Sequence, residues 1–326
     1  IFKKVDKMRI CLLRTPSGIR DGGNIMCDYI NHAIRLLGYE LLDTGFGKWN
    51  INEMKEFNPD WIFHIHGYHL TLGHIEDLKN NFKNVPIVIW SQNDEIESWR
   101  KMILAYSNKI DLYCTYTKVG LEEHKNNGAN VMLLPIAADN TVFYKINDDN
   151  IKNNSKFKFR CGMFGSIESG RREFQVRLEA TGFETLKFFH SSLSYAEMNE
   201  MCNFTGFLVD PWQHCDEYGI DYKGYQVAWG LPCRTFEVPC AGGFQLQIER
   251  PGLWEVFNED EVAIMNTRDV NEWIDKIKFY EQNLDVYNSI KQKGWERVQK
   301  EHLYIHRINQ VIDRLKSDGL LKKDLV

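Results

Sequence analysis

Short apolar runs alternate with amphipathic stretches along almost the whole chain, and this alternation restricts the folds that it can adopt. The runs of the first half predict six strands, at residues 8–13, 39–42, 61–65, 86–90, 111–116 and 131–135. Strands that alternate with helices form parallel sheets, because each crossover returns the chain to the same end of the sheet. The runs are almost continuously apolar, as in strands that helices cover on both faces. The first half therefore predicts a doubly wound α/β domain.

A polar segment, residues 145–156, interrupts the alternation and has the composition of a linker. Beyond it, further apolar runs predict a second parallel sheet and then a helical end; the runs are 157–164, 184–189, 206–209, 244–248 and 262–265. The length of 326 residues suits two domains. We expect a Rossmann-like domain over 1–150, a second over 157–300, and a C-terminal helix, 301–326, that packs back across the interface.

Open α/β sheets bind ligands at the carboxyl ends of their strands. We therefore expect the two sheets to face a central cleft that contains the site, with the 210–232 segment, rich in aromatic and acidic residues, along its wall.

The composition narrows the range of partners. A formal net charge of −5 argues against general binding to nucleic acid or to an anionic membrane. No apolar stretch reaches the ~20 residues that span a bilayer, and no signal peptide is recognisable. The eight cysteines form no Cys-x-x-Cys pair, which is typical of reduced, buried thiols. These features predict a cytoplasmic protein.

Gly22 and Gly23 lie in the loop after the first predicted strand, directly before a helix. Glycines let backbone N–H groups approach a ligand, and a helix N-terminus attracts phosphate. We expect this loop to lie near a bound phosphate or an acceptor group, with a plain turn as the alternative.

Two histidines, His64 and His66, end the third predicted strand, and alternation places them on the same side of it. One interpretation puts them in the cleft, with His66 as a catalytic candidate that contacts a phosphate or an acceptor hydroxyl. The alternatives are satisfied core or loop histidines, or a metal site, which would need a ligand that the motif lacks. Asp94 follows the fourth predicted strand and is either a general base or a helix N-cap, with Glu97 three residues on.

A glycine turn and paired arginines open the second domain. Gly165 and Ser166 follow its first predicted strand, and Arg171 and Arg172 stand at the head of the next helix. Guanidinium groups donate two hydrogen bonds at once to a phosphate, and the helix dipole favours an anion at this end. The group is therefore a candidate diphosphate clamp; a solvated basic helix face is the alternative.

Arg234 and Glu237 stand three residues apart and so share one face of a helix that ends at Gly242 and Gly243. A carboxylate there can accept both hydroxyl groups of a ribose, while the arginine balances charge or contacts phosphate. The alternative is a local ion pair followed by a glycine C-cap. Spacing alone does not decide between the two.

The stretch from Arg234 to Gly243, Arg-Thr-Phe-Glu-Val-Pro-Cys-Ala-Gly-Gly, resembles the glycosyltransferase group 1 family, in particular its CgeB-like branch. The Phe-Gly-Ser motif at 164–166 and the closing Tyr-Ile-His-Arg motif at 304–307 resemble further motifs of that branch. The resemblance covers residues 86–315 and is more specific in the second domain than in the first.

This resemblance implies a GT-B fold and a nucleotide-sugar donor, linked to UDP or GDP, which is a substrate rather than a cofactor. It also implies that the transferred sugar retains its anomeric configuration and that no metal is bound. The implied donor-binding residues are Gly165, Ser166, Arg171, Arg172, Arg234, Glu237, Gly242 and Gly243. Among them, Glu237 would hold the ribose, and Arg171 or Arg172, with Arg234, would contact the diphosphate. The acceptor, whether glycan, protein, lipid or small molecule, is not identified.

The sequence departs from the wider family at Trp229, where many retaining members carry a first glutamate eight residues before the second. A non-catalytic nucleotide-sugar or glycan-binding protein is therefore an alternative, as is a GT-B epimerase or glycoside phosphorylase. Pro239 removes one backbone donor from the expected helix, which leaves the geometry near Glu237 open.

Overall fold

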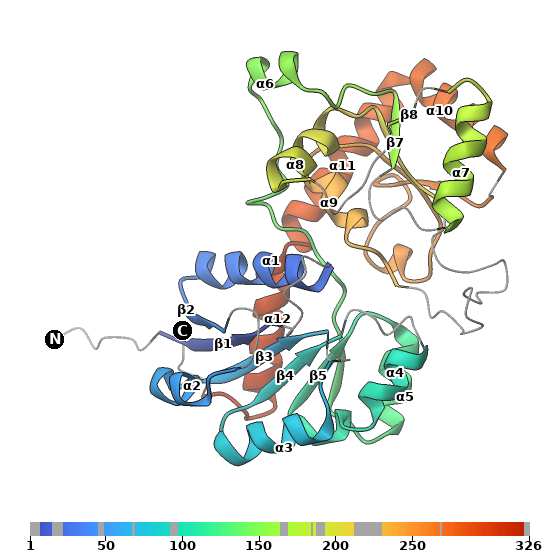
Figure 1. Ribbon diagram of the computed structural model, residues 1–326. Helices are drawn as coiled ribbons and strands as arrows, with labels where there is room; N and C mark the ends of the chain where they lie inside the picture. The colour runs from blue at the N-terminus through green and yellow to red at the C-terminus, as the bar shows by residue number, and fades with distance from the viewer. Residues whose placement is uncertain are drawn as a thin grey trace. The chain divides into compact units, whose positions relative to one another are not determined.

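Figure 1 shows the computed structural model of the chain. It describes residues 7–14, 22–44, 49–66, 69–91, 97–163, 169–183, 185–186, 193–211, 230–267 and 269–322. The chain divides into two compact units, one formed by Ile1–Pro135 with Tyr304–Val326 and the other by Ile136–Leu303. This division reflects how compactly each part of the chain packs. It does not test the domain ranges expected from the sequence, which stay predictions.

A six-stranded parallel sheet forms the centre of the first unit. Its order is β2-β1-β3-β4-β5-β6, with β1 (Arg9–Leu13), β2 (Glu40–Asp43), β3 (Trp61–Ile65), β4 (Ile87–Trp90), β5 (Leu112–Thr115) and β6 (Val131–Leu133). Each strand overlaps one of the six apolar runs of the sequence. Strands β3, β4 and β5 are buried along their whole length, as expected for a sheet covered on both faces. The predicted doubly wound sheet is confirmed.

Helices of the first unit come from both ends of the chain. The described elements are α1 (Gly22–Leu36), α2 (Ile51–Phe57), α3 (Leu72–Asn81), α4 (Glu97–Leu104), η1 (Ser107–Lys109), α5 (Lys118–Asn126) and α12 (Tyr304–Ser317). Helix α12 packs against α1, where the rings of Tyr29 and Tyr304 lie 5.7 Å apart. The buried Arg307 donates from Nε to the carbonyl oxygen of Pro135 at 2.7 Å. The C-terminal helix therefore returns to the first sheet, as expected.

Side-chain caps determine where several helices begin. Asn50 accepts backbone hydrogen bonds at the start of α2, and Thr117 does so for α5. Ser194 and Glu197 form a reciprocal capping box at the start of α8 (Tyr195–Phe204). Such caps satisfy backbone donors that the helix itself leaves unpaired.

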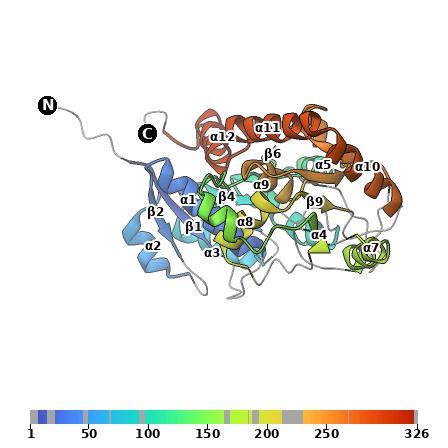
Figure 2. The ribbon, with the colours of Figure 1, turned by 90° about the horizontal axis from the view of Figure 1, so that it is seen from above.

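The second unit is built on a five-stranded parallel sheet. Its order is β11-β10-β9-β7-β8, with β7 (Cys161–Met163), β8 (Thr185–Leu186), β9 (Phe207–Asp210), β10 (Gln245–Ile248) and β11 (Ala263–Met265). Besides α8, the helical elements are α6 (Asp149–Asn154), α7 (Ser169–Ala180), α9 (Arg234–Cys240), η3 (Leu253–Glu255), α10 (Val270–Gln282) and α11 (Leu284–Glu301). Helices α10 and α11 follow one another along one side of the unit (Figure 2).

Strand order reverses once in each sheet, next to the first strand of the unit. In the first unit β2 and β3 lie on opposite sides of β1, and in the second unit β8 and β9 lie on opposite sides of β7. Ligands of open α/β sheets bind at the carboxyl ends of the strands where the order reverses. These two places are therefore where a functional site is expected. None of the described helices is long and apolar enough to cross a membrane.

Candidate functional site

Three charged side chains meet at the carboxyl ends of β9 and β10. Asp210 is the last residue of β9, and its side chain is only 1% exposed. Arg234 donates from Nη1 to Oδ1 of Asp210 at 2.8 Å, and Arg250 donates from Nη2 to Oδ2 at 3.0 Å. Burial of a carboxylate is costly unless charged partners and hydrogen bonds compensate for the lost water. Both oxygens of Asp210 receive such a partner.

The local fold explains why these residues meet. Asp210 lies beside Gln247 in the register of β9 and β10. Thr235, in the first turn of α9, donates from Oγ1 to Oε1 of the buried Gln247 at 2.9 Å. This bond ties the start of α9 to β10 and so holds the preceding Arg234 near the end of β9. Arg250 stands two residues after β10 ends.

Glu237 lies in the same helix as Arg234, and the residue is 3% exposed. Helix α9 continues past Pro239, since Ala241 donates its backbone N–H to the carbonyl oxygen of Glu237 at 3.1 Å. The proline therefore does not break the helix at Glu237. The carboxylate that the structure describes beside Arg234 is Asp210, and the local ion pair with Glu237 stays a prediction.

Gly242 and Gly243 have a packing role within the second unit. Gly242 has a positive φ of 74°, and a Cβ atom there would lie 2.8 Å from side-chain carbons of Lys145. A Cβ atom on Gly243 would overlap the carbonyl oxygen of Cys202 and approach Cγ1 of Val238 to 2.9 Å. These contacts and the positive φ of Gly242 explain why both positions are glycine, and no bound ligand is needed for that explanation. Close approach of the donor to these glycines stays a prediction.

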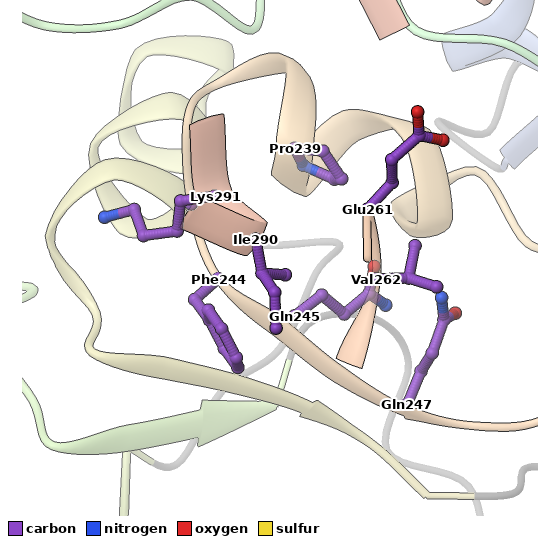
Figure 3. A pocket seen from close by; sticks show the side chains of 9 residues that line it. Pro239, Phe244, Gln245, Gln247, Glu261, Val262, Ile290 and Lys291 are labelled. Atoms are coloured by element: carbon purple, nitrogen blue, oxygen red, sulfur yellow. The ribbon is translucent and has the colours of Figure 1, made fainter. Parts of the chain in front are cut away.

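A small cavity lies under α9, beside β10 (Figure 3). Its volume is about 10 Å³, and its lining includes Phe244, Gln245 and Lys291. The Oε1 atom of Gln245 is buried without a hydrogen-bond partner among the described residues. This space has room for one water molecule, which such an acceptor would bind. A nucleotide does not fit there.

The predicted diphosphate clamp is described only in part. Helix α7 begins shortly after β7, as the glycine turn and the paired arginines suggested, and Arg172 is exposed on it. Gly165 and Ser166, together with the side chain of Arg171, lie outside the described residues. Their roles stay predictions.

His64 is a core histidine. Its Nδ1 lies 3.0 Å from the carbonyl oxygen of Leu13, so Nδ1 carries the proton that is donated. Burial lowers the pKa of His64 to about 3, more than this hydrogen bond raises it, and the neighbouring His66, His69 and His74 lower it further. His64 is therefore neutral, and the core alternative applies to it. The described residues contain no group of three or more His, Cys, Asp or Glu side chains placed to hold a metal ion.

His66 differs from His64, because strand β3 ends at Ile65 and His66 has a positive φ of 82°. Strand alternation therefore does not determine where its side chain points. Its backbone N–H donates to the carbonyl oxygen of Trp90 at 2.9 Å, and the residue is 6% exposed. A left-handed backbone at a residue other than glycine is strained, and such residues cluster at functional sites. The strained backbone of His66 therefore supports its interpretation as a catalytic candidate.

Arg14 lies where β1 ends, at the reversal of strand order in the first unit. It donates to Asp43 from Nε at 2.7 Å and from Nη2 at 2.6 Å, and its Nη1 lies 2.7 Å from a carboxylate oxygen of Asp28. Burial alone would lower the pKa of Arg14, but the bonds to Asp43 and Asp28 raise it above its ordinary value. Gly22 and Gly23 form the start of α1, and Asp94 lies outside the described residues.

Sequence reasoning assigned no role to Asp210, Arg250 or Arg14. Each ends or closely follows a strand that the sequence did predict. The sequence signal that could have identified these three residues is a charged residue at the end of a predicted strand. Ligands bind at the carboxyl ends of parallel strands.

Residues 160–313 match the family described as glycosyl transferase-like. No curated protein matches the chain. The fold is similar to that of sucrose-phosphate synthase from Thermosynechococcus elongatus, at 11% identity and a TM-score of 0.65 over 96% of this chain and 100% of the other. It is also similar to Anabaena HepE in complex with UDP-glucose, at 11% identity and a TM-score of 0.61 over 95% of this chain and 100% of the other.

A putative UDP-N-acetylglucosamine 2-epimerase from Listeria monocytogenes has a similar fold too. It is 12% identical, with a TM-score of 0.58 over 96% of this chain and 97% of the other. Identities this low show the fold alone.

Proposed function

We propose that this chain, which has a GT-B fold and matches the glycosyl transferase-like family over residues 160–313, transfers a sugar from a UDP-sugar to an acceptor hydroxyl. In this proposal the second unit binds the donor. The first unit, with His66 and Asp94 as candidates, handles the acceptor.

The observation that carries the proposal is the pair of arginines around Asp210. It lies at the carboxyl end of β9, next to the reversal of strand order, inside the segment that matches the family. Guanidinium groups suit phosphate because they are always charged and donate in a planar fork. Arg234 would contact the diphosphate, with Arg171 or Arg172, and Glu237 would accept the ribose hydroxyls.

The chemistry that this arrangement supports is stabilisation of the leaving group. When the bond between the sugar and the diphosphate breaks, negative charge grows on the nucleotide, and fixed positive groups stabilise that charge. The resemblance to the glycosyltransferase group 1 family implies, in addition, that transfer proceeds without a metal and with retention of anomeric configuration. The choice of UDP rests on HepE, a protein of similar fold that was solved with UDP-glucose. A cytoplasmic location stays a prediction.

A nucleotide-sugar epimerase is the second candidate, because the Listeria protein shares the fold to a similar degree. Incubation with UDP-glucose or UDP-N-acetylglucosamine separates the two. An epimerase interconverts the intact nucleotide sugar, whereas a transferase releases UDP in proportion to the acceptor supplied.

The proposal is tested by binding of nucleotides to the wild-type chain. UDP and UDP-sugars should raise the midpoint of thermal unfolding by mass action, with or without Mg²⁺, and GDP-sugars should do so less. Glu237→Ala should weaken UDP binding, and Arg177→Ala, on the exposed face of α7, is the matched control. If no nucleotide shifts the midpoint, or if only the magnesium samples respond, the proposal is rejected.

A further inference from the structure

Arg250 is one of the two arginines around Asp210, but the donor site as proposed gives it no ligand contact of its own. We propose that Arg250 is a positioning residue of this site, and that it sets the charge presented to the donor diphosphate by neutralising Asp210. This inference rests on the proposed function and deepens it.

Two arginines contact opposite oxygens of Asp210. Among the described contacts, Oδ1 accepts a hydrogen bond from Arg234 and Oδ2 accepts one from Arg250. The carboxylate of Asp210 thus pairs with both arginines. The side chains of Arg234 and Arg250 are 12% and 13% exposed. All three groups are held where water screens charge poorly.

The charge of the trio depends on Arg250. Two guanidinium groups and one carboxylate carry a formal charge of +1, since arginine stays protonated at any physiological pH. Without Arg250, Asp210 and Arg234 would form a neutral pair. The negative charge of Asp210 would then largely cancel the attraction between Arg234 and a diphosphate. With Arg250 in place, the carboxylate orients Arg234 while the group remains positive.

A further detail of Arg250 fits a functional constraint. Its Nε is buried and has no hydrogen-bond acceptor among the described residues. An unsatisfied buried donor is unfavourable for stability, and native proteins contain few of them. The bond of Arg250 to Asp210 is therefore the described contact that explains an arginine at this position.

Four proteins test this inference by changing the charge of the trio in steps. Wild type carries +1, Arg250→Gln carries 0, Asp210→Asn carries +2, and the double variant returns to +1. Affinities for UDP and for uridine are measured by titration calorimetry and ligand-observed NMR at two salt concentrations. Circular dichroism and thermal unfolding show that each protein is folded.

We expect Arg250→Gln to weaken UDP binding by about 10-fold, the effect of one well-placed charge, and to leave uridine binding unchanged. The double variant should regain most of the lost UDP affinity, although it lacks both side chains. Asp210→Asn should show the steepest loss of UDP affinity with added salt.

Two results overturn the inference. One is UDP affinity in Arg250→Gln equal to that of wild type, and the other is an equal loss for UDP and uridine, which indicates a structural role. If Arg250→Gln does not fold, the comparison of Asp210→Asn with the double variant decides, and equal UDP affinity in those two overturns it. Failure of wild type to bind UDP would instead reject the proposed function.

Discussion

In the first unit one arginine is shared by two carboxylates, whereas in the second unit one carboxylate is shared by two arginines. Arg14 pairs with Asp28 and Asp43 where β1 ends, and Asp210 pairs with Arg234 and Arg250 where β9 ends. The first cluster lies at a reversal of strand order and the second lies next to one, both at the carboxyl edge of a parallel sheet. Their formal charges are −1 and +1.

Clusters at the carboxyl edges of two similar sheets can therefore differ in function, because their charges differ in sign. An anionic ligand is attracted to the second cluster and repelled by the first. We therefore assign the cluster of the first unit to the stability of the fold, and we propose that the cluster of the second unit binds the donor. Variants of each cluster can separate these two roles.

Arg14→Met should destabilise the protein by about 3 kcal/mol, because it leaves the partly buried Asp28 and Asp43 without their cation. Chemical denaturation measures this loss. Under conditions where the variant is folded, its affinity for UDP should equal that of wild type. A weaker UDP affinity in the folded variant would mean that the first cluster also takes part in donor binding.

Arg234→Met should have the opposite profile. UDP affinity should fall by roughly 10- to 100-fold, the loss of a charge-assisted contact to phosphate, while stability changes less than in Arg14→Met because Arg250 still pairs with Asp210. Titration calorimetry with UDP measures the effect, and Arg177→Ala serves as the exposed arginine control. An unchanged affinity would remove the arginine from the donor site.

Acid should destabilise the first unit through two buried histidines. Burial lowers the pKa of both His64 and His124 to about 3, against an ordinary value near 6.5 in the unfolded chain. The unfolded chain therefore binds more protons below pH 6.5, so stability is full above that pH and falls as the pH drops. The slope reaches about 1.4 kcal/mol per pH unit for each histidine.

Urea unfolding at pH 7, 6 and 5 measures this slope. His64→Asn, whose side-chain amide keeps a donor for the carbonyl oxygen of Leu13, should have a shallower pH dependence than wild type. An identical dependence would show that His64 does not contribute.

Thr235→Val should cost about 1 kcal/mol of stability, because it removes the donor to Oε1 of the buried Gln247 while keeping the shape of the side chain. The same bond holds the first turn of α9, so UDP affinity should fall by no more than a few fold. If UDP affinity falls as much in Thr235→Val as in Arg234→Met, the bond between Thr235 and Gln247 is as important for UDP binding as Arg234 itself.

The sequence predicted the strands well and the ion clusters poorly, for one physical reason. Strands such as β3 and β4 are local apolar runs, so pattern alone locates them within a residue or two. The partner of Asp210 is set by register, which brings Arg250 beside it from 40 residues away. No local pattern contains that pairing.

Two further features were also beyond local patterns. Strand alternation assigned His66 to the same side as His64. However, strand β3 ends at Ile65, and His66, the next residue, has a positive φ. At Gly243 the structure adds a contact that the sequence did not indicate, because the carbonyl oxygen of Cys202 lies where a Cβ atom would be. Close backbone contacts of this kind depend on how helices pack, which composition and spacing do not encode.

The most direct test of the account is a crystal structure of the chain with UDP. The account predicts a phosphate oxygen within about 3 Å of the Arg234 guanidinium, with the ribose hydroxyls at Glu237. UDP bound elsewhere, for instance beside Arg14 in the first unit, would contradict it.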